Sequence, residues 1–165
     1  MTQALYSLAE EIGRRLLERR HKLVTAESCT GGWLAKCVTD IAGSSEWFDR
    51  GFVTYSNQAK MEMLGVPEAE LIRYGAVSPE TVQNMALGAL RNSAAQLAIA
   101  VSGIAGPGGG TLQKPVGTVL FAWQMEGEPC RTEARQFSGN RNRVREHAVK
   151  FALQVGVSLY AGFHK

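Results

Sequence analysis

The spacing of apolar side chains predicts that helices and strands alternate along the chain. Over residues 4–20, the apolar residues Leu5, Leu8, Ile12 and Leu16 recur at helical spacing with charged residues between them. Similar patterns and helix-start residues predict further helices over residues 33–41, 57–64, 78–92 and 141–160. Short apolar or β-branched runs predict strands over residues 23–26, 51–55, 97–101, 117–124 and 130–137.

Two of these segments indicate how the sheet is built. Residues 97–101 (LAIAV) are uninterruptedly apolar, which is typical of a strand covered on both faces. Residues 125–129 (MEGEP) are short enough to join the last two strands as an antiparallel hairpin. Because helices and strands alternate early and a hairpin comes late, we expect one domain over residues 1–165. Its fold class is α/β, a three-layer α/β/α sandwich with a mixed, mostly parallel sheet.

Small polar residues follow four of the predicted strands. These segments are Ser28-Cys29-Thr30, Tyr55-Ser56-Asn57, Ser102-Gly103 and Ser138-Gly139-Asn140. Ligands of such sheets bind beyond the carboxyl ends of the strands. If these strand ends share one edge of the sheet, the sequence predicts a single polar pocket there.

Composition narrows the classes of function. The 165 residues are 45% hydrophobic and 20% charged with a formal net charge of +3, which is too mild to indicate nucleic acid as the main partner. No apolar run approaches the roughly 20 residues of a membrane helix, and the N-terminus lacks the apolar core of a signal peptide. Three cysteines without a CxxC pair argue against a disulfide framework and a zinc site. We therefore expect a cytoplasmic protein that needs no metal.

The segment Glu27–Gly32 (ESCTGG) lies between a predicted strand and a predicted helix. Backbone N–H groups at such a junction can hold the oxyanion that forms when a nucleophile attacks a carbonyl, so Ser28 is a candidate nucleophile. A serine before a helix is also a common cap, and paired glycines also permit close packing. Cys29 is either a competing nucleophile or a small buried residue.

Histidine is a poorly supported base for Ser28, because only His147 of the three histidines could approach the site. Lysine can act as the base when burial or a neighbouring cation lowers its pKa. Lys60 follows Tyr55 by five residues, on a predicted helix directly after a strand end, so both side chains can reach the same edge. The alternatives are a solvated helix face for Lys60 and a half-buried aromatic residue for Tyr55.

The loop of residues 102–110 (SGIAGPGGG) is rich in glycine. Its backbone N–H groups can point into one concavity that holds a phosphate, which makes Ser102, Gly103 and Gly106 candidate binding residues. The loop matches neither the dinucleotide-binding nor the P-loop pattern. A flexible surface loop is the alternative.

Residues 131–150 carry a local excess of positive charge. Within this stretch, Arg141 and Arg145 lie four residues apart and therefore on one helix face near its N-terminus. Arginine beside a helix N-terminus favours a phosphate or a carboxylate. A solvated basic face is the alternative.

Several segments together resemble the CinA C-terminal domain family. They are TAESCTGG (25–32), GFVTYSNQAK (51–60), GAVSPET (75–81), SGIAGPGGG (102–110) and KPVGTV (114–119). These motifs follow the family's order, and the likeness around them extends over nearly the full chain. The resemblance implies hydrolysis of nicotinamide mononucleotide to nicotinate mononucleotide and ammonia, and no metal or organic cofactor is expected. Two-domain members carry an N-terminal domain with a separate pyrophosphatase activity, for which this chain has no room.

The resemblance also implies roles for individual residues. Ser28 would be the nucleophile, with Lys60 and Tyr55 as its partners and the proton acceptor left open between these two. The expected substrate-binding residues are those of the N–H groups around the nucleophile, the glycine loop and the basic helix: Cys29, Thr30, Gly31, Gly32, Ser102, Gly103, Gly106, Arg141 and Arg145.

Two other functions remain in competition with hydrolysis. In a non-catalytic nucleotide-binding or regulatory module, Ser28 would be only a helix cap. A DNA-associated factor is disfavoured by the modest charge and by the lack of interleaved aromatic residues. We expect a small-molecule substrate, no nucleic-acid or membrane partner, and a homodimer.

Overall fold

The computed structural model describes residues 1–161, which alternate between helices and strands as the sequence predicts. In chain order the elements are α1 (Gln3–Arg19), β1 (Leu23–Glu27), α2 (Trp33–Thr39), the 3₁₀ helix η1 (Ser44–Glu46), β2 (Phe48–Val53), α3 (Asn57–Leu64), α4 (Glu68–Tyr74), α5 (Pro79–Arg91), β3 (Leu97–Gly103), β4 (Thr118–Met125), β5 (Arg131–Gln136) and α6 (Arg141–Ala161). Two of them, η1 and α4, are absent from the sequence-based expectation. In α4 only Leu71 is buried and Ile72 is 80% exposed, so the helix has no apolar stripe to reveal it.

The five strands form one mixed sheet in the order β2-β1-β3-β4-β5. Strand β1 pairs in parallel with β2 and β3, whereas β3–β4 and β4–β5 are antiparallel pairs. The predicted late hairpin is therefore confirmed. Strands β1, β2, β3 and β5 all point the same way, so their carboxyl ends share one edge of the sheet.

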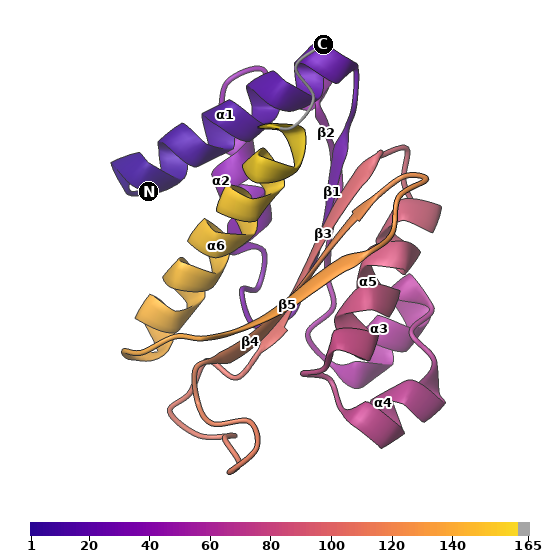
Figure 1. Ribbon diagram of the computed structural model, residues 1–165, viewed down its shortest axis with the longest axis vertical. Helices are drawn as coiled ribbons and strands as arrows, with labels where there is room; N and C mark the ends of the chain where they lie inside the picture. Colours follow the sequence, from indigo (N-terminus) through magenta and orange to yellow (C-terminus); the bar gives the residue numbers. More distant parts are fainter. Residues whose placement is uncertain (162–165) are drawn as a thin grey trace.

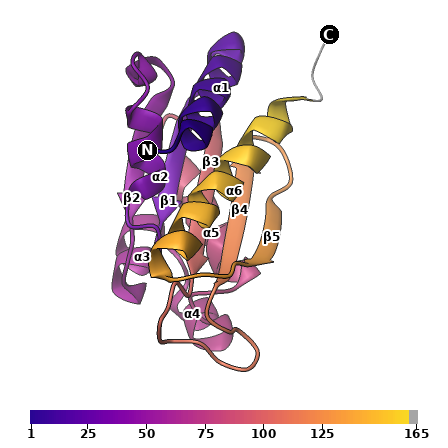
Figure 2. The ribbon, with the colours of Figure 1, turned by 90° about the vertical axis from the view of Figure 1, so that its left-hand side faces the viewer.

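Helices cover both faces of this sheet, which confirms the three-layer α/β class (Figure 1, Figure 2). Helices α1, α2 and α6 lie on one face, and α3, α4 and α5 lie on the other. Residues 97–101 of β3 are all apolar because this strand is covered on both faces: Leu97, Ile99 and Val101 face α1 and α6, while Ala98 and Ala100 face α5.

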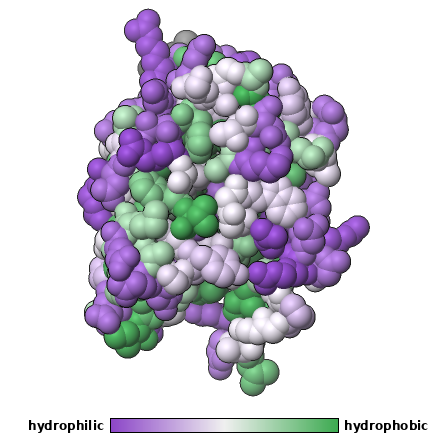
Figure 3. Space-filling model, turned by 180° about the vertical axis from the view of Figure 1, so that it is seen from behind, coloured by the Kyte–Doolittle hydropathy of each residue, from purple (hydrophilic) through white to green (hydrophobic). Residues whose placement is uncertain are grey.

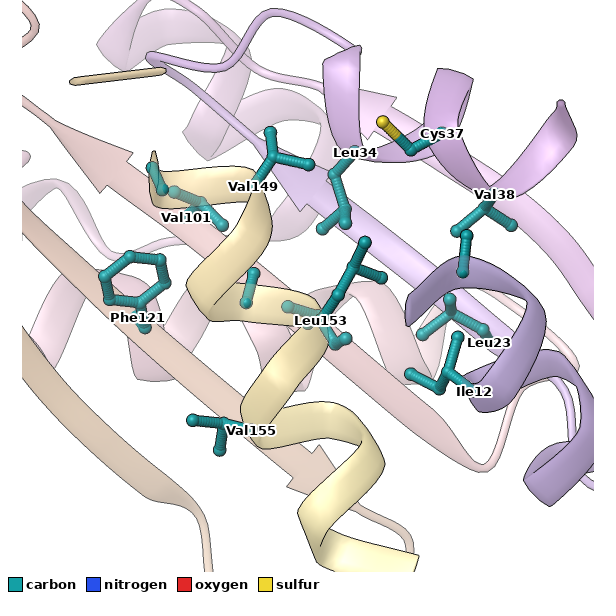
Figure 4. Packing of buried hydrophobic residues seen from close by; sticks show 14 of the residues in the cluster. Ile12, Leu23, Leu34, Cys37, Val38, Val101, Phe121, Val149, Leu153 and Val155 are labelled. Atoms are coloured by element: carbon teal, nitrogen blue, oxygen red, sulfur yellow. The ribbon is translucent and has the colours of Figure 1, made fainter. Parts of the chain in front are cut away.

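The two faces differ in the size of their side chains. Between the sheet and α1, α2 and α6, branched and aromatic residues such as Leu153 and Phe121 fill the core (Figure 4). On the other face, α5 packs over alanines, and Gly88 lets it approach α3 so closely that an added Cβ would lie 1.9 Å from the Leu64 carbonyl oxygen. This close packing fixes α3, the helix that carries Lys60.

The surface of the molecule is mixed. Seen from behind, apolar residues appear in groups surrounded by hydrophilic ones (Figure 3). Within the described part of the chain, none of the helices has the length and apolar character needed to cross a membrane.

Candidate active site

The register of the parallel strands brings three chain segments together at the carboxyl edge of the sheet. Glu27, the last residue of β1, lies beside Val53 of β2 and Val101 of β3. The residues that follow these positions open onto a small cavity of about 210 Å³. It is lined by Ser28, Cys29, Tyr55, Lys60, Ala76, Ser102, Gly103, Ala105 and Arg141.

Ser28 and Lys60 meet at the base of this pocket. The Lys60 Nζ lies 3.1 Å from the Ser28 Oγ, 2.8 Å from the Thr54 carbonyl oxygen and 3.3 Å from the Tyr55 carbonyl oxygen. Lys60 is fully buried although it lies in the first turn of α3, and Ser28 is only 9% exposed. The solvated helix face considered for Lys60 is therefore wrong.

Burial favours the neutral form of this amine. It lowers the pKa of Lys60, because the charged form loses its hydration, and no carboxylate forms an ion pair with the amine among the described residues. A neutral amine has two N–H donors and one lone pair. The two carbonyls can accept the donors, which leaves the lone pair to accept the Ser28 proton. This geometry suits a general base.

Tyr55 contributes to the same pocket in a different way. Its backbone carbonyl accepts from Lys60, whereas its side chain is 61% exposed and its hydroxyl accepts from the Arg141 Nη2 at 3.0 Å. Neither Ser28 nor Lys60 bonds to that hydroxyl in this structure. The phenol therefore lies at the mouth of the pocket, beside a cation.

Arg141 and Arg145 face different pockets although they share one helix. Arg141 lines the Ser28 cavity and also donates to the Gly106 carbonyl at 2.8 Å. Arg145 donates to the Cys29 and Thr30 carbonyls at 3.0 Å each. Its guanidinium lies over the ring of Trp33. The structure thus places only Arg141 beside Ser28.

Thr30, Gly31 and Gly32 also lie away from the Ser28 cavity, in a neighbouring pocket of about 400 Å³ that contains Arg145 and Trp33. Both glycines have a left-handed backbone, with φ of +60° and +95°, which turns the chain sharply after Ser28. The Gly31 N–H donates to the Ser28 carbonyl. The N–H groups of Cys29 and Thr30, the two residues that follow Ser28, donate to no other described residue.

The residue that sequence reasoning passed over is Glu27. Its side chain is fully buried, accepts from the Thr30 hydroxyl at 2.7 Å, and accepts from the Leu34 and Ala35 N–H groups at 2.8 and 3.0 Å. Burial raises the pKa of this carboxyl, and the hydrogen bonds from Thr30 and the backbone oppose the rise. An acidic residue at the end of an apolar strand was the available signal, since an acid is rarely buried without bonded partners.

The competing catalytic groups are poorly placed. Burial raises the pKa of the Cys29 thiol to about 12, so its nucleophilic thiolate is disfavoured. The ring of His147 packs 5.8 Å from that of Phe137 and does not line the cavity. In the part of the chain that the structure describes, no cluster of three His, Cys, Asp or Glu side chains could hold a metal ion.

The glycine loop reaches the cavity only at its start. Ser102, Gly103 and Ala105 line it, whereas Gly106 does not, although its carbonyl accepts from Arg141, and residues 107–110 are exposed. After β5, Ser138 and Gly139 are exposed and Asn140 caps α6 by accepting from the Arg143 N–H. The fourth polar strand end therefore serves mainly to start the helix that carries Arg141.

The sequence as a whole matches the model of the CinA C-terminal domain over residues 5–159. The chain belongs to the CinA C-terminal domain family. Among its relatives, the nicotinamide-nucleotide amidohydrolase PncC of Escherichia coli (strain K12) is 53% identical over 150 residues, covering 91% of each chain. The protein of the same name from Enterobacter agglomerans is 54% identical over 153 residues, covering 93% of each chain.

Solved structures of this family have the same fold. The crystal structure of the competence/damage inducible protein CihA from Agrobacterium tumefaciens superposes with a TM-score of 0.94 at 42% identity, covering 96% of this chain and 97% of that one. The family resemblance seen in the motifs is thus confirmed over the whole domain.

Proposed function

We propose that the protein is a nicotinamide-nucleotide amidohydrolase that hydrolyses the carboxamide of nicotinamide mononucleotide. The single observation that carries this proposal is the contact between the buried Lys60 amine, whose pKa is lowered by burial, and the Ser28 hydroxyl in a small polar pocket. The amidohydrolase relatives, at more than half identity over most of both chains, support the substrate.

In the reaction, Lys60 is the base and Ser28 the nucleophile. The lone pair of Lys60 takes the Ser28 proton while the Ser28 Oγ bonds to the carboxamide carbon. The negative charge that develops on the carboxamide oxygen is held by the N–H groups of Cys29 and Thr30. Lys60 then gives its proton to the leaving nitrogen, the C–N bond breaks, and ammonia departs.

The resulting ester between Ser28 and the nicotinoyl group is cleaved by water. Lys60, again neutral, accepts a proton from the attacking water, and the Ser28 oxygen takes a proton back as the ester bond breaks. The product is nicotinate mononucleotide. The positive pyridinium ring withdraws electrons from the carbonyl, which makes both attacks easier.

Arg141 is the cation that this pocket offers to the 5′-phosphate. It is exposed at the pocket mouth, and its two hydrogen bonds to Tyr55 and Gly106 leave further guanidinium donors free. Tyr55 holds the side chain of Arg141 in place through its hydroxyl and its ring borders the entrance. In this arrangement the amine of Lys60, rather than the phenol of Tyr55, is the proton acceptor.

The direct test is to incubate the purified protein with nicotinamide mononucleotide and to follow both products. We expect nicotinate mononucleotide and ammonia in equal amounts, with no metal added. Tight binding of the mononucleotide without release of ammonia would instead indicate a non-catalytic nucleotide-binding module. The homodimer and the cytoplasmic location stay predictions.

A further inference from the structure

The turn that carries Ser28, residues 28–32, is held by two groups that do not line the catalytic cavity. The first is the Glu27 carboxylate, which bridges from the end of β1 to the first turn of α2. Its Oε1 accepts from the Thr30 hydroxyl and the Leu34 N–H, and its Oε2 accepts from the Ala35 N–H. The chain leaves Glu27, passes through Ser28 and the two glycines, and is tied back to Glu27 seven and eight residues later.

The second group is the Arg145 guanidinium, which reaches the turn from α6. Its Nε donates to the Cys29 carbonyl and its Nη2 donates to the Thr30 carbonyl, both at 3.0 Å. The planar side chain also lies over Trp33, with its Cζ 5.4 Å from the ring centroid. Arg145 thus links the turn to a helix that is more than 100 residues away in sequence.

We propose that Glu27 and Arg145 are positioning residues, which clamp this turn from two sides and thereby fix the Ser28 hydroxyl against Lys60. The inference rests on the proposed role of Ser28 as the nucleophile. The Glu27 carboxylate accepts from N–H and O–H groups of the turn and of α2, and the Arg145 guanidinium donates to carbonyl oxygens of the turn. The polar groups on both sides of the turn therefore have charged partners. A turn with two left-handed glycines has little stiffness of its own, and the clamp supplies it.

The same clamp keeps the oxyanion donors free. The Cys29 carbonyl that Arg145 holds lies in the same peptide plane as the Thr30 N–H, which is thereby fixed. The Cys29 N–H lies in the peptide plane of the Ser28 carbonyl, which is held within the clamped turn by the Gly31 N–H. Neither the Cys29 nor the Thr30 N–H donates to another described residue, so both stay available. A misplacement of about 1 Å in such a geometry can lower a rate by about 10²-fold. Loss of the clamp should therefore lower kcat and leave the binding of the phosphate at Arg141 unchanged.

A pair of variants at Thr30 tests the Glu27 side with little risk to folding. Thr30→Val keeps the shape of the side chain and removes the donor to Glu27, whereas Thr30→Ser keeps the hydroxyl. We expect Thr30→Val to lower kcat for nicotinamide mononucleotide by about tenfold with an unchanged KM, and Thr30→Ser to keep kcat within about threefold. Equal kcat values in the two variants, or a rise in KM alone, would overturn the clamp at Glu27.

Glu27→Gln is the stronger variant, because one α2 N–H must then face an amide N–H. Its control is Gln124→Glu, the reverse substitution at a buried residue at the opposite end of the sheet. Gln124 is 6% exposed, and its amide nitrogen donates to the Met125 and Glu128 carbonyls. We expect both to lower the urea midpoint and only Glu27→Gln to lower kcat of the folded fraction. Similar losses of kcat in both would reduce Glu27 to a structural residue.

Arg145→Met tests the other side and keeps an apolar chain against Trp33. The clamp predicts a fall in kcat of about tenfold at unchanged KM. A rise in KM with an unchanged kcat would make Arg145 a ligand of the substrate and overturn its positioning role. Failure of the proposed function looks different, since the wild type would then release no ammonia, or Ser28→Ala would release it at the wild-type rate.

Discussion

The turn after β1 and the loop after β3 both contain adjacent glycines and both follow a buried strand at the same edge of the sheet. In the turn, Gly31 and Gly32 have left-handed backbones, and the polar groups around them bond to Glu27 and Arg145. In the loop, the φ of Gly108 lies outside the left-handed region, so residues other than glycine can adopt it, and an added Cβ there would have no neighbour within 4 Å.

This difference separates the turn that carries the proposed nucleophile from a surface loop of similar composition. The turn is fixed by side chains of Glu27 and Arg145. The loop between β3 and β4 is tied to other parts of the molecule near its ends, where Gly106 accepts from Arg141 and the Lys114 Nζ donates to the Tyr74 carbonyl, and between these ends its hydrogen bonds are local, such as that from the Thr111 N–H to the Lys114 carbonyl. Between these ends, Leu112 is 98% exposed. Chemistry is therefore expected from the turn, and anchoring of the substrate from the base of the loop.

The largest effect should come from removing the hydroxyl in the turn. We expect Ser28→Ala to lower kcat for nicotinamide mononucleotide by about 10³-fold or more, because the nucleophile is lost. The neighbouring Cys29→Ala should stay within about fivefold of the wild type, since a thiol with a raised pKa takes no part. An inactive Cys29→Ala together with an active Ser28→Ala would contradict the assignment of the nucleophile.

The next effect concerns the base that faces the turn. Burial lowers the pKa of Lys60 and only its neutral form can accept a proton, so kcat should rise with pH through a pKa below the ordinary lysine value of 10.5. Lys60→Met should lower kcat by about 10²–10⁴-fold and abolish this rising limb. The exposed Lys150→Met serves as the matched control and should keep both the rate and the limb. An unchanged pH profile in Lys60→Met would assign the titration to another group.

Most of the fold follows from short-range patterns in the sequence. The predicted helix over residues 57–64 has those bounds in the structure, and Ser78 caps α5 as its sequence suggests, by accepting from the Thr81 N–H. Strand β2 starts at Phe48, three residues earlier than predicted, because half of its residues face solvent at the edge of the sheet and give no continuous apolar run. Helix α4 was not predicted because it likewise lacks a regular apolar pattern, with only Leu71 buried.

The site is predictable where strand ends carry it and unpredictable where distant side chains do. Ser28, Tyr55 and Lys60 lie near the ends of two parallel neighbours, so the sheet brings them together. The spacing of four residues between Arg141 and Arg145 indicates a common face, yet it cannot show that the turn would engage one guanidinium and leave the other in the cavity. The buried role of Glu27 likewise depends on where α2 begins.

A smaller effect is expected at the base of the loop. In Gly106→Ala the new Cβ would lie 2.5 Å from the Val116 Cγ1 on a backbone with φ of +82°, so we expect a loss of about 1–3 kcal/mol in the free energy of unfolding. Because the Gly106 carbonyl holds Arg141, KM for the mononucleotide should also rise several-fold. Gly127→Ala is the control: it has φ of +77° and open space, so it should show the backbone strain without the rise in KM. A rise in KM in both variants would break the link to Arg141.

The smallest effect is expected in the middle of the loop. Gly108 lies outside the left-handed region and has no neighbour within 4 Å of an added Cβ, so Gly108→Ala should raise the free energy of unfolding by about 0.4–1 kcal/mol by restricting the unfolded chain. Both kcat and KM should stay within about twofold of the wild type, since the exposed part of the loop contacts neither Ser28 nor Lys60. Steady-state kinetics and urea unfolding measure the two quantities. A clear rise in KM would mean that the loop folds over the phosphate during turnover, and the contrast between a fixed turn and a passive loop would then fail.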